Sequence, residues 1–277
     1  MTSGRAIDHL VLAVRDLDRA AGIWRGLGFT LTPRAMHEDR MGTSNRLAQF
    51  GGRNFVELLE VDRPDRLQPH DLVGNPPFYG FGDHNRRFLA RREGLSMLVF
   101  ASDDARADLA RFQAAGLSTA APFDFERQAV LPDGSRVTVS FSLAFAWSDA
   151  MPDVGFFACQ NRAQRYFWKP DYQRHENGAT GIAAVYLVSP EPERDAGFVS
   201  RLFGGEVTAA HVGFRVACGP HAVLVLTPDA VAAIDPASPA AKTETPLLAG
   251  LRLTAREPRP LTPSAAACGA FIEWVAN

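Results

Sequence analysis

The stretch IDHLVLAVRDLDRAAGIWRGLGF, residues 7–29, decides the fold. Residues 7–14 form a largely apolar run that is typical of a buried strand. Apolar side chains then recur at helical spacing after Asp16, a suitable N-cap, and Gly28 ends that helix. The stretch therefore predicts a strand, a helix and a further strand that starts at residues 29–32.

The same order of strand, helix and glycine occurs three times. LSMLVFA, residues 95–101, and GIAAVYLV, residues 181–188, are predicted strands that each precede a predicted helix. The glycines that end the three helices, Gly28, Gly116 and Gly204, are separated by 88 residues each. A fixed period of this length indicates a repeated structural unit.

Each copy continues with short strands. RLAQFGG and NFVELLEV predict a hairpin that turns at Gly51 and Gly52. In the second copy RVTVSFSLAFA follows a predicted turn at residues 132–135, and VGFFACQ comes last. In the third copy GFRVAC and HAVLVLT form the hairpin. LLAGLRLTA and GAFIEWVA, separated by a proline-rich segment, predict a degenerate fourth copy without a helix.

The repeats predict an α+β fold in which β-α-β-β-β modules form curved mixed sheets around a cleft. One module alone leaves open sheet edges, so we expect modules to pair and to bind a ligand at the concave face. Two regions are predicted: paired modules within residues 1–165, at 5–62 and 94–160, and a third module with the remnant within 178–277. Linkers rich in proline, arginine and aromatic residues interrupt the repeat at 62–93 and 161–179.

The composition favours a small-molecule ligand. The 277-residue chain has 29 Lys and Arg against 31 Asp and Glu, a net charge of −2, which gives no support for nucleic-acid binding. Only two cations are lysine, which suggests a GC-rich bacterial genome. An odd number of cysteines, three, favours a reducing compartment, and an N-terminal apolar run of only five residues is too short for a signal peptide or a membrane span. We therefore expect a cytoplasmic protein that has no membrane partner. A homodimer is left open. Nucleophile-elbow, P-loop and dinucleotide fingerprints are missing from the sequence.

Three stretches carry a family resemblance: DHLVLAVRDLDRA from residue 8, HEDRMGTSNRLAQFG from residue 37, and NFVELLEV from residue 54. Together they resemble the vicinal oxygen chelate superfamily, which includes glyoxalase I, extradiol dioxygenases and bleomycin-binding proteins. The second stretch is similar to the glyoxalase-like domain group. The resemblance is strongest over residues 5–62, weaker over 94–160, and faint beyond 178.

The resemblance implies metal ligands on the first and fourth strands of each module. In the first module these positions carry His9 and Glu57, which suit Zn, Fe, Mn, Ni or Co. Alternation places Glu57 on the same strand face as Leu59. The second module has Ser96 and Met97 where histidine is usual, and Phe157, Ala158 and Cys159 where glutamate is usual. The metal is therefore either relocated or absent.

Five further residues are site candidates. His37 is a third ligand, an acid–base group or a surface histidine, and Asn45 would bind substrate or orient a ligand. Glu273 in FIEWV aligns with Glu57 in FVELL and would complete the metal site only if the remnant packs beside the first module. His175 is a site residue or a turn histidine. Arg86 belongs either to a lid that binds an anionic substrate group or to a packing segment.

The resemblance implies a glyoxalase-like enzyme that acts on a small oxygenated metabolite. In that chemistry a metal stabilises an enolate and a carboxylate moves a proton, as in lyases, isomerases and dioxygenases. Without a metal, Glu57 becomes the base and His9 its partner. The alternative is a metal-free protein that sequesters a small molecule, as in bleomycin resistance. Trp24, Phe141, Phe145, Phe156 and Phe157 would line its cleft or fill the core.

Overall fold

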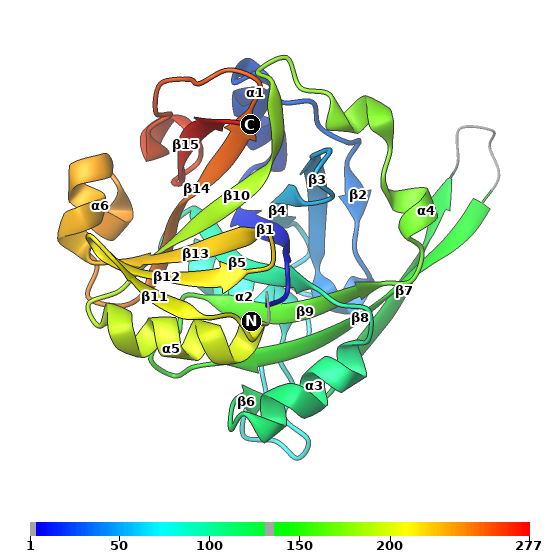
Figure 1. The fold of residues 1–277 in the computed structure, drawn as a ribbon. Helices are drawn as coiled ribbons and strands as arrows, with labels where there is room; N and C mark the ends of the chain where they lie inside the picture. The colour runs from blue at the N-terminus through cyan, green and yellow to red at the C-terminus, as the bar shows by residue number, and fades with distance from the viewer. Residues whose placement is uncertain (1–3, 131–135) are drawn as a thin grey trace.

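The computed structural model describes residues 4–130 and 136–277, whose strands form two curled mixed sheets (Figure 1). This is the predicted α+β fold of repeated modules around a concave face. The turn predicted at residues 132–135 lies outside the described residues. No helix of the described ranges is long and apolar enough to cross a membrane.

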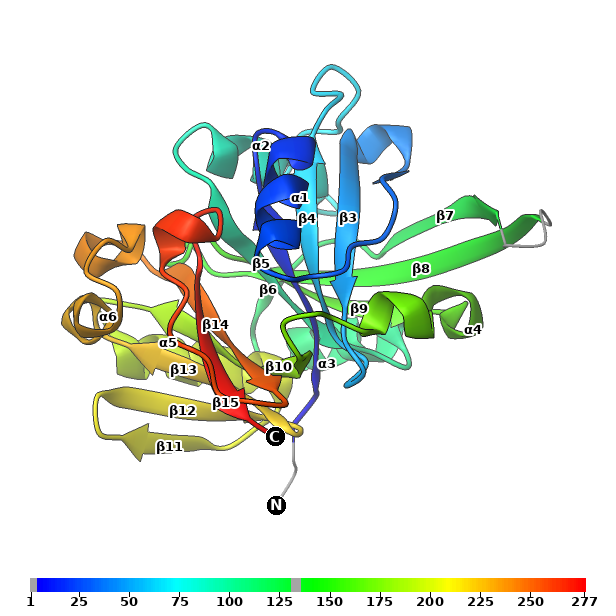
Figure 2. The same cartoon turned by 90° about the horizontal axis from the view of Figure 1, so that it is seen from above.

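The first sheet contains the first two modules. The order of its strands is β2 (Ala35–Met36), β3 (Thr43–Gln49), β4 (Phe55–Val61), β1 (Ile7–Ala13), β5 (Gly94–Ala101), β9 (Gly155–Asn161), β8 (Arg136–Trp147) and β6 (Ser118–Thr119). β7 (Phe123–Val130) pairs with β8, and the two extend as an arm in Figure 2. β1 and β5 pair antiparallel at the centre, while β4 runs parallel to β1 and β9 parallel to β5.

The second sheet contains the third module and the C-terminal remnant. The order of its strands is β11 (Val207–Ala210), β12 (Gly213–Cys218), β13 (His221–Leu226), β10 (Ala179–Val188), β14 (Leu247–Ala255) and β15 (Phe271–Ala276). β10 pairs antiparallel with β14, as β1 does with β5. The modules therefore pair in chain order, and the remnant supplies two strands.

Six α-helices lie in the described residues: α1 (Leu17–Gly26), α2 (Phe81–Leu89), α3 (Ala105–Ala114), α4 (Gln164–Phe167), α5 (Pro192–Phe203) and α6 (Pro228–Ile234). α1, α3 and α5 are the three repeated helices. Asp16 and Asp104 cap α1 and α3 by accepting two backbone N–H bonds each. Gly28, Gly116 and Gly204 all have a positive φ just after their helices. The 88-residue period is thus a repeat of helix ends.

One core joins both sheets. It contains one face of each sheet and the inner faces of α1, α3 and α5. Strand alternation divides the side chains: Leu10 and Leu12 of β1 enter this core, whereas Val11 joins a second cluster on the concave face of the first sheet. Trp24 and Phe156 belong to the shared core, whereas Phe145 belongs to the concave cluster. The division into two domains stays a prediction.

Two expectations about local structure are wrong. Residues 29–32 are not a strand, because Thr30 and Phe29 instead contact the linker between the sheets. The linker at 62–93 contains α2, which was not predicted because the proline, arginine and aromatic content of this segment was interpreted as typical of a linker. Phe81 and Phe88 of α2 are buried, so this segment packs onto the first sheet.

The equivalent glycines Gly28 and Gly116 provide a stability prediction. Gly116→Ala should lower the free energy of unfolding by about 1 kcal/mol, because φ is +70° and no heavy atom lies within 4 Å of the added Cβ. Gly28→Ala should lower the free energy of unfolding by at least about 1 kcal/mol more than Gly116→Ala does, because the added Cβ would lie 3.0 Å from the backbone nitrogen of Asn177. Urea unfolding measures the free energy of unfolding of both variants. Equal decreases in the two variants would contradict the destabilising effect of the contact with Asn177.

Candidate functional site

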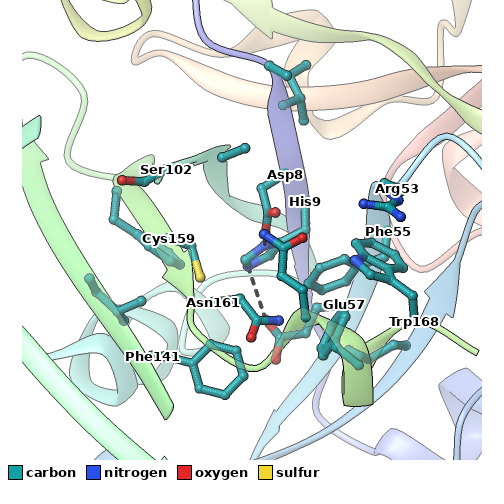
Figure 3. A pocket seen from close by; sticks show the side chains of 18 of the residues that line it. Asp8, His9, Arg53, Phe55, Glu57, Ser102, Phe141, Cys159, Asn161 and Trp168 are labelled. Atoms are coloured by element: carbon teal, nitrogen blue, oxygen red, sulfur yellow. Dashed lines mark hydrogen bonds and ion pairs between the residues drawn. The ribbon is translucent and has the colours of Figure 1, made fainter. Parts of the chain in front are cut away.

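A cavity of about 290 Å³ lies at the concave face of the first sheet. Aromatic rings form much of its wall, from β4, β7, β8, β9, α2 and the segment around α4: Phe55, Phe81, Phe125, Phe141, Phe157, Phe167 and Trp168. Figure 3 shows Cys159 and Phe141 on one side of His9 and Glu57, and Phe55 and Trp168 on the other. A small cavity with apolar walls and a few convergent polar groups is typical of a ligand site.

Glu57 is the centre of the polar part of this cavity. The residue is only 4% exposed. Oε2 lies 3.6 Å from Nε2 of His9, and Oε1 lies 3.4 Å from Nε2 of His37. The structure therefore brings together three residues that the sequence selected, although β1, β4 and the segment before β3 are separate in the chain.

Asn45 of β3 joins the same group. Its Nδ2 donates a 2.6 Å hydrogen bond to Oε1 of Glu57 and lies 3.1 Å from Nε2 of His37. Both N–H bonds of the amide are thus used when His37 carries its proton on Nδ1, toward Thr43 Oγ1 at 2.8 Å. Oδ1 of Asn45 is buried without a hydrogen-bond partner among the described residues.

Asp8 orients His9. Nδ1 of His9 lies 2.6 Å from Oδ2 of Asp8, so a proton on Nδ1 is held there and Nε2 faces Glu57. The sequence assigned Asp8 no role in the site, because adjacent strand residues normally point to opposite faces. The pairing of β1 with β5 shifts register between Ile7 and His9, so the alternation is interrupted at this point. The only sequence signal was that Asp8 directly precedes His9.

The strand pairing identifies the counterparts of His9 and Glu57 in the second module. Glu57 is the register partner of Val11 on β1, and Phe157 is the register partner of Val99 on β5. Because Val99 follows Val11 by the repeat period of 88 residues, Phe157 corresponds to Glu57, and Met97 corresponds to His9. At these two positions the first module therefore carries acid–base groups and the second module carries apolar side chains.

The donor set does not fit a resident metal. No group of three or more His, Cys, Asp or Glu side chains in residues 4–130 and 136–277 is arranged to hold a metal ion. One oxygen of Glu57 already accepts from Asn45, and the corresponding positions of the second module, Met97 and Phe157, offer no hard ligand. The expected set of His9, Glu57 and Glu273 is thus not assembled.

Cys159 lies near the carboxylates and is not activated by them. Burial raises the pKa of its thiol well above the usual value, and the nearby charges of Asp8 and Glu57 act in the same direction. The side chain is therefore a neutral thiol in the cavity wall. A thiolate nucleophile or thiolate metal ligand is not favoured here.

Glu273 lies in the second sheet. β15 pairs with β14, so the strands of the remnant extend the second sheet and do not extend the sheet of the first module. The carboxylate of Glu273 accepts hydrogen bonds from Tyr186 and Arg252. The condition under which Glu273 would join His9 and Glu57 is not met, because the modules pair in chain order.

Arg86 and His175 lie outside the cavity lining. Arg86 of α2 forms an ion pair with buried Asp83 at 2.6 Å, which supports the packing alternative for this segment. His175 accepts from the backbone N–H of Thr30 at 3.0 Å, and its Nε2 lies 2.8 Å from the carbonyl oxygen of Gln49. These contacts hold the linker between the sheets against the first module.

Arg53, Asn161 and His221 also line the cavity, and sequence reasoning did not select them. Arg53 follows the hairpin glycines and has a φ of +57°. His221 comes from the second sheet, where its Nδ1 accepts from the backbone N–H of Ile7 at 3.0 Å. A local pattern could not find these residues, because distant segments meet only in the folded chain.

The comparisons with known proteins agree with this fold. The family model described as a glyoxalase-like domain matches residues 7–203. A hypothetical protein from Staphylococcus aureus has a TM-score of 0.73 at 13% identity, covering 98% of this chain and 99% of that chain. The Mn(II)-bound glyoxalase from Novosphingobium aromaticivorans has a TM-score of 0.54 at 13% identity, covering 99% and 82%.

A mutant of 4-hydroxymandelate synthase from Streptomyces coelicolor has a TM-score of 0.51 at 15% identity, covering 92% of this chain and 72% of that chain. At these identities the solved structures show a shared fold. No curated protein matches this chain.

His84 in α2 supports a prediction of acid sensitivity. Its Nδ1 lies 2.9 Å from Tyr79 Oη, its Nε2 lies 3.1 Å from the carbonyl oxygen of Ser96, and burial lowers its pKa to about 4. Protonation therefore favours the unfolded chain, whose histidine pKa is near 6.5. The stabilising contribution is complete above pH 6.5 and is lost as the pH falls to 4, by about 3 kcal/mol.

The test compares wild-type protein with His84→Gln by urea unfolding between pH 7 and pH 4. The variant should be less stable at pH 7, because its side chain replaces two buried hydrogen bonds imperfectly. Its free energy of unfolding should fall less steeply with decreasing pH than that of the wild type. The same slope in both proteins would exclude His84 as the titrating group.

Proposed function

The chain belongs to the glyoxalase-like domain family, and on that premise we propose that it catalyses proton transfer on a small oxygenated metabolite, with Glu57 as the general base. The observation that supports this proposal is the buried Glu57 carboxylate, which contacts two imidazoles and one amide inside a ligand-sized cavity. A carboxylate in such surroundings exchanges a proton with a carbon acid when the substrate excludes water.

The two oxygens of Glu57 have different roles in this proposal. Asn45 holds Oε1, so Oε2, which faces His9, is the atom that accepts the proton. The substrate C–H bond breaks, its electron pair moves to the neighbouring carbonyl oxygen, and an enolate forms. His9, held through Nδ1 by Asp8, presents Nε2 to that oxygen and donates a proton when both ring nitrogens are protonated. For a 2-hydroxy carbonyl substrate, Glu57 then gives its proton to the former carbonyl carbon while the 2-hydroxyl oxygen returns a proton to Nε2 of His9, which restores both side chains and completes an isomerisation.

No step of this reaction is assigned to a metal. The fold family includes metal-binding members, and the solved relatives include a Mn(II)-bound glyoxalase. In this chain no group of three or more His, Cys, Asp or Glu side chains in the described ranges is arranged to hold a metal ion, although His9 and His37 both face Glu57. Among lyase, isomerase and dioxygenase chemistry, the proposal therefore favours lyase or isomerase chemistry, in which side chains transfer protons.

The alternative function is metal-free binding of a small molecule without reaction. The apolar half of the cleft favours it, because Phe157 and Met97 replace the ligand types that the family resemblance implies. Aromatic walls bind flat apolar molecules by stacking and burial. Both functions use the same cavity, so only turnover separates them. A cytoplasmic location and a homodimer stay predictions.

The test of catalysis is deuterium exchange into carbon acids. Wild-type protein in D₂O, incubated with a panel of small 2-oxo acids, 2-hydroxy aldehydes and hemithioacetals, should accelerate exchange of at least one C–H bond, followed by proton NMR. Glu57→Gln should slow that exchange by about 10²- to 10⁴-fold, because it removes the base but keeps the shape. Glu60→Gln is the matched control: Glu60 follows on the same strand and pairs with Arg34 instead.

Equal exchange by Glu57→Gln and wild type would contradict the role of Glu57. Binding of panel compounds without exchange, detected by tryptophan fluorescence, would favour the sequestering alternative. Metal content is measured in the same preparations, purified without chelator. We expect no stoichiometric metal in wild type or His9→Ala, and one metal per chain that disappears in His9→Ala would overturn the assignment of metal-independent chemistry.

A further inference from the structure

A second cavity adjoins the first. It has a volume of about 590 Å³ and lies between β2 and β3 on one side and the segment around α4 on the other. Asn45, Leu47 and Phe167 line both cavities. The concave face of the first sheet therefore carries one cleft with two chambers, and the proposed base lies in only one of them.

The two chambers differ in charge. Three carboxylates, of Asp8, Glu57 and Asp103, and one cation, Arg53, line the first chamber. Among the described residues no carboxylate lines the second, whereas Arg34 and Lys169 do. Arg34 is paired with Glu60 and Asp62, so Lys169, one of only two lysines in the chain, supplies the positive charge of this chamber. Such a chamber attracts an anionic group.

The cationic chamber also has a fixed wall with aromatic rings. Gln49, which is 2% exposed, donates from Nε2 to the carbonyl oxygen of Phe167 at 2.9 Å and accepts from the backbone N–H of Lys169 at 3.3 Å. These two bonds hold the backbone on both sides of Trp168. Tyr166 and Tyr172 also line the chamber. Tyrosine rings beside a cation are suited to a planar ring that carries a negative charge.

Lys169 forms no ion pair with any carboxylate of residues 4–130 and 136–277, whereas Arg34 already pairs with Glu60 and Asp62. The lysine ammonium is therefore the group that an incoming anion would meet. At the junction of the chambers, buried Oδ1 of Asn45 is an acceptor without a protein donor within those ranges. A ligand that passes this point with an N–H or O–H group would satisfy it.

We propose that the second chamber binds the non-reacting end of the substrate, a planar ring that bears an anionic group, with Lys169 and Tyr172 as its main contacts. This inference rests on the proposed function for the identity of the reacting end. Remote binding of this kind would position the reacting carbon at Glu57 in the first chamber. The substrate class is thus an extended organic anion whose charge is separated from its reacting carbon.

The experiment measures binding of 1-naphthyl phosphate, 1-naphthoate and neutral 1-naphthol by titration calorimetry. Wild type should bind both anions more tightly than 1-naphthol, and 0.5 M salt should weaken only the anions. Lys169→Gln should weaken anion binding by about fivefold to tenfold, the usual effect of one charge-assisted contact, and leave 1-naphthol unchanged. Lys242→Gln, at the other lysine, which is exposed in the second half of the chain, is the matched control and should change nothing.

Two further variants locate the ring. Tyr172→Ala should weaken all three probes, whereas Phe141→Ala, in the wall of the first chamber only, should weaken none. Loss of binding in Phe141→Ala but not in Tyr172→Ala, or anion binding unaffected by Lys169→Gln, would overturn the proposal. Glu57→Gln should bind the probes as wild type does, so a failure of the catalytic proposal and a failure of this one give different results. Tighter binding of phosphate or of carboxylate identifies the kind of anion.

Discussion

The antiparallel pairing of β1 with β5 is the contact on which the site depends. It joins the first two modules into one curled sheet and leaves β4 and β9 on either side of the pair. His9 and Glu57 then face the same concave surface as Phe157 and Cys159. Without this pairing each module would have an open edge at its first strand and no cleft.

The backbones of the first two modules pair symmetrically, but the side chains at corresponding positions differ. The first module provides Asp8, His9 and Glu57, and the second provides Met97 and Phe157 at the positions that correspond to His9 and Glu57. At these matching positions the two modules therefore differ, with acid–base groups in the first and apolar side chains in the second.

The segment between the two sheets closes the cleft and divides it. Gln49, Phe50 and Thr30 hold it through hydrogen bonds to Phe167, Gln173 and Arg174. Phe167 consequently stands between an acid–base chamber and a cationic chamber. His175, which is hydrogen-bonded to the first module, helps to fix this segment.

The sequence alone determined the repeat, because helix caps, glycine ends and strand alternation are local and recur every 88 residues. It also selected His9, Glu57, His37 and Asn45, whose types and positions match a family pattern. The position of Glu273, the role of Asp8 and the charge of the second chamber followed only from the tertiary structure. Strand pairing determines which modules lie side by side, and so places Glu273 in the second sheet. A register shift in the pairing of β1 with β5 brings Asp8 to the same side as His9. Lys169 contacts Gln49 of β3, although the two residues are more than one hundred positions apart in the sequence. These are long-range contacts, and local sequence patterns do not encode them.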